Sequence, residues 1–144
     1  MNPLRRRLMV VIAVLAVAGI ADSSLSLQRH YAKSKTAFCD IAETFNCDIV
    51  NRSEYSSIGP IPVALIGILG YAALAGLATL YRSRPDTPRL LLGGAAAGLA
   101  FALYLTYIEG HVLGVWCILC LISLSLISCI TAVSAVVWRK SRNL

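Results

Sequence analysis

The chain has 144 residues, enough for one domain, of which 58% are hydrophobic and 14% charged. Soluble domains carry about 25% charged residues, so this composition and a mean hydropathy of +0.74 exclude an ordinary soluble protein. The net charge of +6 would suit nucleic-acid binding, but the basic residues flank apolar runs, where they set membrane topology instead. We expect a single integral membrane domain over residues 1–144 and no nucleic-acid partner.

Four apolar runs are long enough to cross a membrane, because about 30 Å of hydrocarbon at about 1.5 Å per residue needs about 20 residues. No water is present there to satisfy backbone groups, so the runs are predicted to be helices. They cover roughly residues 8–27, 60–81, 90–108 and 115–138. The predicted fold is an all-α membrane protein, a bundle of four transmembrane helices that run alternately up and down.

The first run, 8–27, follows Arg5, Arg6 and Arg7, as the apolar part of a signal peptide would. It is longer than the usual 7–15 residues or so of such a segment, and no Ala-x-Ala-type cleavage site closes it. We therefore expect it to remain as a helix. The polar stretch 28–59 that follows is predicted to be an outer loop containing a short surface helix.

Short polar segments separate the remaining runs. Pro60 and Pro62 suit the first turn of the second helix, where a missing N–H is harmless. Residues 82–89 and 109–114 are predicted to be tight turns, which makes the helices on either side antiparallel. The Gly-Ala-Ala-Ala-Gly segment at 94–98 is typical of a face where helices approach closely.

The charges predict the orientation. Five of the seven acids lie on the side of the loop 28–59, and nine of the 13 basic residues lie on the other side. By the positive-inside rule the basic side is cytoplasmic and carries both termini. Because no eukaryotic retention signal is present, we expect a multi-pass protein of the bacterial inner membrane. The nine basic residues are Arg5, Arg6, Arg7, Arg82, Arg84, Arg89, Arg139, Lys140 and Arg142.

Four cysteines form two pairs on the predicted outer side, where disulfides persist. Cys39 and Cys47 lie in the polar loop, and Cys117 and Cys120 form a Cys-x-x-Cys at the start of the last run. On a helix the latter two share a face, and a helix N-terminus favours the thiolate form. Cys129 has no partner in this scheme and is predicted to be a small packing residue.

The two pairs predict a redox relay, because disulfides exchange by thiolate attack on a sulfur. A partner dithiol would reduce Cys39–Cys47, Cys47 would pass electrons to Cys117, and Cys117–Cys120 would pass them to an acceptor in the bilayer. Two alternatives remain: purely structural disulfides, and a zinc site of four thiolates. Zinc is disfavoured, because the Cys-x-x-Cys has no His or acid beside it and the chain has no second Cys-x-x-Cys.

These residues resemble a known family. The pattern Cys-Asp…Cys-Asp-Ile-Val-Asn-x-Ser-x-Tyr…Pro-x-x-Leu-x-Gly, followed by Val-Trp-Cys-x-x-Cys, is similar to the bacterial homologues of vitamin K epoxide reductase over nearly the whole chain. The resemblance implies an enzyme that oxidises a thioredoxin-like or DsbA-like partner and reduces a quinone, either ubiquinone or menaquinone. It implies that Cys39 and Cys47 are the shuttle pair, that Cys117 and Cys120 are the active pair with Cys120 facing the quinone, and that the Ser53 hydroxyl lies at the quinone oxygen.

The chain departs from the family in several places. The vertebrate enzymes have Asn and Tyr where Val63 and Leu124 stand here, which suits quinone reduction rather than epoxide reduction. Many bacterial relatives carry a fused thioredoxin-like domain, whereas this chain ends at Leu144, so we expect a separate periplasmic partner. Trp116 would form an aromatic wall near the quinone or anchor the helix at the membrane interface.

Two rival functions are considered. A DsbB-like oxidase also has four helices and uses a quinone, but it places the Cys-x-x-Cys in the first outer loop, and here the order is reversed. A non-catalytic membrane subunit with structural disulfides is the rival from another class. Two titratable residues stay open: His111, as a loop residue or a proton relay, and Asp22. Asp22 is an acid within a predicted span and thus a candidate for function, but its position near the outer surface, beside Ser23 and Ser24, argues against a functional role.

Overall fold

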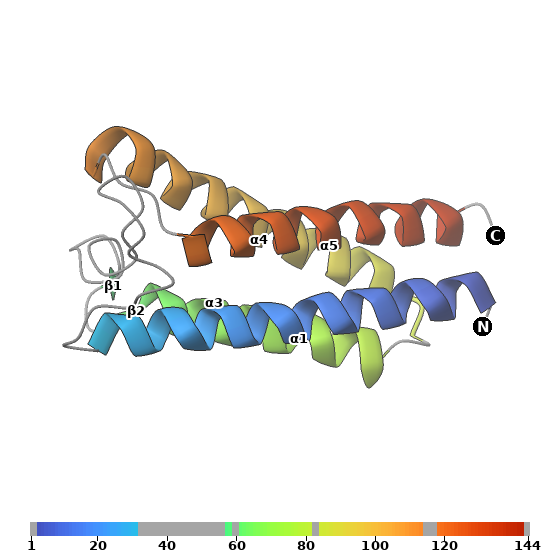
Figure 1. Ribbon diagram of the computed structural model, residues 1–144. Coiled ribbons are helices and arrows are strands. Elements are labelled where there is room, and N and C mark those ends of the chain that lie inside the picture. The colour runs from blue at the N-terminus through green and yellow to red at the C-terminus, as the bar shows by residue number, and fades with distance from the viewer. Residues whose placement is uncertain (1–2, 32–56, 59–60, 82–83, 114–117, 143–144) are drawn as a thin grey trace.

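The computed structural model describes residues 3–31, 57–58, 61–81, 84–113 and 118–142. Apart from two short strands, every element in these ranges is helical, which confirms the all-α prediction. Figure 1 shows the helices lying along one another, with both termini at one end of the molecule and the strands at the other. The elements are α1 (Pro3–Tyr31), β1 (Ser57–Ile58), β2 (Ile61–Pro62), α3 (Val63–Thr79), α4 (Thr87–Tyr107), the π-helix η2 (Ile108–Leu113) and α5 (Ile118–Arg142).

Three of the described helices are long and apolar enough to cross a membrane. These segments are Pro3–Gln28 in α1, Thr87–Tyr107, which is α4, and Ile118–Lys140 in α5. α3 is apolar but has 17 residues, so at about 1.5 Å per residue it extends roughly 26 Å, below the ~30 Å of hydrocarbon. Three predicted spans are therefore matched by helices of sufficient length, and the second is shorter than predicted.

A two-residue β ladder explains why α3 begins late. β1 and β2 pair antiparallel, with Ser57 opposite Pro62 and Ile58 opposite Ile61. Pro62 is the N-cap of α3 and has extended backbone angles, φ −65° and ψ 140°. The prediction that it lies in the first helical turn is wrong, because the proline ring restricts φ and leaves ψ free to follow the ladder.

Two other predictions fall partly or wholly outside the described residues. Pro60 lies outside them. Of the segment predicted to hold a surface helix, Ser57 and Ile58 are described, and they form strand β1 rather than a helix.

A tight turn joins α3 to α4, as predicted. The Arg84 amide donates to the Tyr81 carbonyl at 3.1 Å, and the Thr87 hydroxyl donates to the same carbonyl. The guanidinium of Arg5, near the start of α1, donates to the Arg84 carbonyl at 3.0 Å. These hydrogen bonds hold α3 antiparallel to α4 and connect their turn to α1.

The predicted tight turn after α4 is wrong. The chain remains helical beyond Tyr107 and forms the π-helix η2 (Ile108–Leu113). Ile108, the C-cap of α4, has helical angles of φ −60° and ψ −43°, so the backbone continues into the wider π-helical turn. The rings of Tyr107 and His111 lie 4.7 Å apart across this junction.

The core lies where α1 packs against α3 and α5, and where α4 packs against α5. Small residues allow the close approach: a Cβ added to Gly67 would lie 2.8 Å from the Ser23 hydroxyl oxygen, and one added to Gly98 would lie 3.3 Å from Ile127. Gly98 belongs to the segment 94–98, so its predicted packing role is confirmed. The buried residues of the core cluster are Met9, Ile12, Ala16, Tyr71, Leu74, Ala78, Leu91, Ala95, Ile127, Ile130 and Val137.

The tightest of these contacts gives a prediction for stability. Gly19 of α1 lies so close to the Tyr71 ring that an added Cβ would overlap it, and Tyr71 is buried, with 6% of its surface exposed. We expect Gly19→Ala to lower the free energy of unfolding by about 1–3 kcal/mol, the usual cost of overpacking, measured by thermal unfolding in detergent. Gly93→Ala is the control, because its Cβ meets nothing within 4 Å. Equal stability of the two variants would contradict the contact.

Candidate redox site

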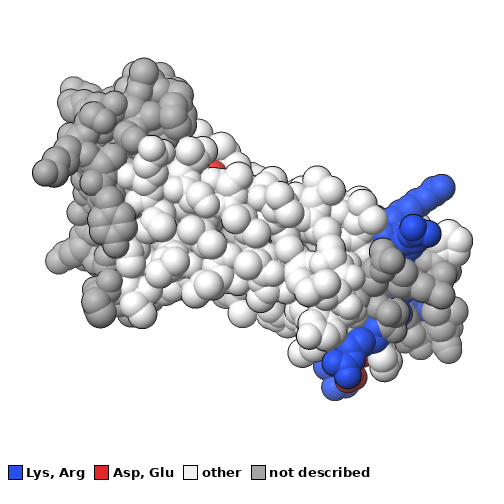
Figure 2. Space-filling view, turned by 90° about the horizontal axis from the view of Figure 1, so that it is seen from below, with Lys and Arg blue, Asp and Glu red and all other residues white. Residues whose placement is uncertain are grey.

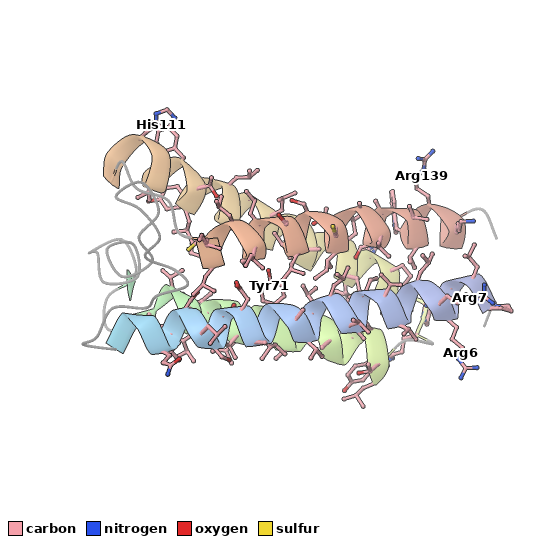
Figure 3. All side chains as sticks on the ribbon, in the orientation of Figure 1. Arg6, Arg7, Tyr71, His111 and Arg139 are labelled. Atoms are coloured by element: carbon pink, nitrogen blue, oxygen red, sulfur yellow. The ribbon has the colours of Figure 1, made fainter. Side chains whose placement is uncertain are left out.

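The two ends of the bundle differ in charge. Figure 2 shows the described Lys and Arg side chains gathered at one end, with mostly uncharged side chains along the length of the molecule. Figure 3 places Arg6, Arg7 and Arg139 at the end that carries the termini, and His111 at the opposite end. α5 begins at that opposite end. The asymmetry read from the sequence is therefore present in three dimensions, and the start of α5 lies far from the basic side chains.

Cys120 lies in the first turn of α5 and is half-buried. Its neighbour Leu119 is 3% exposed, so the start of α5 is already packed within the bundle. Cys120 is the one predicted site residue that the structure describes. The five others lie outside the described residues: Cys39, Cys47, Ser53, Trp116 and Cys117.

A polar bridge crosses the bundle one turn below Cys120. The Tyr71 hydroxyl of α3 donates to the Ser123 carbonyl of α5 at 3.0 Å and lies 2.8 Å from the Ser123 hydroxyl oxygen. Figure 3 shows Tyr71 pointing from α3 toward α5 in the interior. Ser123 follows Cys120 by three residues and lies on the same face of the helix. Sequence reasoning did not identify this bridge, because a lone Tyr and a lone Ser in apolar runs gave no signal.

Buried polar residues continue from this bridge onto α1. Asp22, Ser23 and Ser26 are 6%, 6% and 7% exposed, so the structure buries the Asp22 side chain. The reason is its position next to the surface of α1 that meets α3, where Gly19 contacts Tyr71 and Ser23 contacts Gly67. The spacing of Gly19, Asp22, Ser23 and Ser26 places them on one helix face, but it does not show that this face points inward.

Two further residues are located by the structure. Cys129 is exposed on the outside of α5, so the prediction that it packs inside the bundle is wrong. In a helix whose sides are all apolar, the sequence does not distinguish the side facing lipid from the side facing other helices. His111 is exposed beside Tyr107, at the same end of the molecule as the start of α5.

The comparison with known families decides the assignment. The model of the vitamin K epoxide reductase family matches residues 10–135, a range that extends from α1 into the last turns of α5 and contains Cys39, Cys47, Cys117 and Cys120. The chain belongs to the vitamin K epoxide reductase family. It is a membrane-embedded oxidoreductase that acts on thiols and is linked in general to a quinone or vitamin K.

The residues around Cys120 fit a quinone by their chemistry. A quinone is a flat, largely apolar ring with two carbonyl oxygens, so its site needs a few hydrogen-bond donors among apolar side chains. The Ser123 hydroxyl, 2.8 Å from the Tyr71 hydroxyl, is such a polar group within apolar helices. Leu119 contributes apolar surface at the same end. The start of α5 therefore offers a thiol, an apolar environment and a hydroxyl close together.

The polar bridge gives a second prediction for stability. Tyr71→Phe keeps the ring that packs on Gly19 but removes the hydroxyl bound to Ser123. We expect the free energy of unfolding to fall by about 0.5–1.5 kcal/mol, the net worth of an internal hydrogen bond, as measured by unfolding in detergent. Tyr104→Phe is the matched control, because Tyr104 is 57% exposed. A loss from Tyr104→Phe as large as that from Tyr71→Phe would contradict the bridge.

Proposed function

We propose that this protein generates disulfides: it oxidises a separate thioredoxin-like or DsbA-like protein and passes the electrons to a quinone. The observation that carries the proposal is the position of Cys120, half-buried in the first turn of α5 and one turn above the Tyr71–Ser123 bridge. A thiol at that position is accessible to an acceptor dissolved in the bilayer. A purely structural disulfide between two residues of one helix would add little stability to a bundle of this kind.

The proposed relay uses both cysteine pairs. The partner's two thiols lose two electrons and two protons as its disulfide forms, and the Cys39–Cys47 disulfide is reduced to two thiols. Cys47 then attacks the Cys117–Cys120 disulfide, so that Cys39–Cys47 is restored and the inner pair is reduced. When bound, a quinone accepts two electrons and two protons and becomes a quinol. Re-forming the Cys117–Cys120 disulfide supplies both electrons.

The remaining assignments are part of the same proposal. Ser53 would hydrogen-bond a quinone oxygen, and Trp116 would flank the ring. Residues 1–144 would act as one domain in the bacterial inner membrane, with cytoplasmic termini and a site facing the periplasm. The gathering of the basic side chains at the end with both termini supports this orientation.

The test is reconstitution from purified components. The full chain is mixed with a reduced thioredoxin-like dithiol protein and with ubiquinone or menaquinone, and loss of the quinone is followed by absorbance. We expect one partner disulfide to form for each quinone consumed, with no reaction when the chain is omitted. Absence of quinone loss with both quinones would overturn the proposal.

A redox titration separates this proposal from the rival of a non-catalytic subunit. Structural disulfides resist reduction down to potentials below about −300 mV. Relay cysteines instead equilibrate with the quinone and the partner, so we expect all four to titrate at higher potentials. The titration is read by alkylation of the reduced thiols and mass spectrometry.

A further inference from the structure

Asp22 is a buried acid to which the proposed relay gives no role. It is 6% exposed, and within the described part of the chain its carboxyl forms no hydrogen bond or ion pair. An acid within a membrane helix is costly, and such residues mark proton paths and ligand sites. Its burial without a hydrogen-bond or ion-pair partner among the described residues therefore points to a function.

The helix contacts place Asp22 and Cys120 at the same depth. Gly19 of α1 lies against the Tyr71 ring, and the Tyr71 hydroxyl reaches Ser123 of α5, so these three residues define one level of the bundle. Asp22 lies one turn beyond Gly19, and Cys120 lies one turn before Ser123. α1 and α5 run in opposite directions and pack against each other. Asp22 and Cys120 therefore both lie one turn from this level, toward the end of the bundle opposite the termini.

The environment of Asp22 favours a carboxyl that carries its proton. The described Lys and Arg side chains lie at the other end of the molecule, so among described side chains no cation at this depth compensates a negative charge. A buried carboxylate without such a partner is strongly disfavoured. The described titratable side chains at this end of the molecule are Tyr71 of α3, Tyr107 of α4, His111 of η2 and Cys120 of α5, and of these His111 and Tyr107 are exposed.

We propose that Asp22 is the proton donor for quinone reduction at Cys120, an inference that rests on the proposed function. As the Cys117–Cys120 disulfide forms, two S–H bonds break, and two electrons pass to the quinone. Asp22 gives its proton to a quinone oxygen and regains one of the two protons released by the thiols, and the second thiol proton goes to the other oxygen. Asp22 ends the cycle as an acid, and the two protons lost by the thiols equal the two gained by the quinol.

The kinetic test separates the two halves of the cycle. Pre-reduced full-length protein in lipid nanodiscs is mixed with a quinone, and reduction of the oxidised protein by dithiothreitol is measured separately. We expect Asp22→Asn to slow quinone reduction about a hundredfold, within the usual range for loss of a general acid, and to leave the dithiothreitol step unchanged. Asp22→Glu should restore most of the rate. Asp86→Asn, which removes an exposed carboxyl at the other end of the bundle, is the control and should have no effect.

An infrared measurement tests the donor without turnover. We expect the spectrum of wild-type protein minus that of Asp22→Asn to contain the C=O band of a protonated carboxyl, in both the reduced and the oxidised state, because Asp22 carries a proton at the start and at the end of the cycle. The proposal is overturned if Asp22→Asn reduces quinone at the wild-type rate, or if wild-type protein lacks the band. In both cases wild-type quinone reduction would still support the proposed function, whereas a wild-type protein inert toward quinone would overturn both.

Discussion

Replacing Cys120 with alanine is expected to stop quinone reduction. Cys120 is the described thiol in the first turn of α5, at the end of the bundle opposite the termini. Without it the inner pair cannot form a disulfide, so two electrons cannot be delivered. Loss of an obligatory nucleophile lowers turnover by roughly three orders of magnitude or more in other enzymes, and we expect a fall of that size here. The measurement is steady-state loss of quinone absorbance with purified protein.

The chain provides a matched control on the same helix. Cys129 is exposed, beyond Cys120 along α5, so Cys129→Ala removes a thiol of the same helix without touching the proposed site. We expect Cys129→Ala to retain wild-type turnover. Near-normal turnover of Cys120→Ala in this assay would show that the electrons take another route and would refute the relay.

The second large loss of rate is expected for Cys39→Ala, and it depends on whether the reductant is a folded protein or a small molecule. A folded partner is too large to enter the bundle and must exchange with the loop pair, whereas dithiothreitol is small enough to reduce Cys117–Cys120 directly. With a protein partner, Cys39→Ala should lose at least about a hundredfold in rate, or about 2.7 kcal/mol of transition-state stabilisation. With dithiothreitol the loss should be much smaller.

The comparison between reductants is its own control. Both rates are measured on the same preparation of Cys39→Ala, with quinone loss as the common readout, so a folding defect would lower both rates alike. Equal losses with the two reductants would therefore remove the shuttle role from Cys39. A selective loss with the protein partner would place this cysteine between the partner and the inner pair.

Much of the fold was predictable because its signals are local. Runs of apolar residues determine where helices cross a membrane, and the charged turn before Thr87 separates α3 from α4. The late start of α3 was not predictable in this way, because it depends on pairing of Ile61 with Ile58. The continuation of α4 into η2 was missed for a related reason, since a short polar segment with two glycines reads as a turn in isolation.

The amino-acid sequence by itself determined the membrane class, the approximate spans, the charge asymmetry and the cysteine pattern that identifies the family. Only the tertiary structure decided which side of each helix faces inward. It buried Asp22, exposed Cys129 and joined Tyr71 to Ser123. The physical reason is that lipid is as apolar as a protein core, so the inward and outward sides of a membrane helix have similar compositions. The partner helices, and not the hydrophobic pattern, therefore select the side that packs.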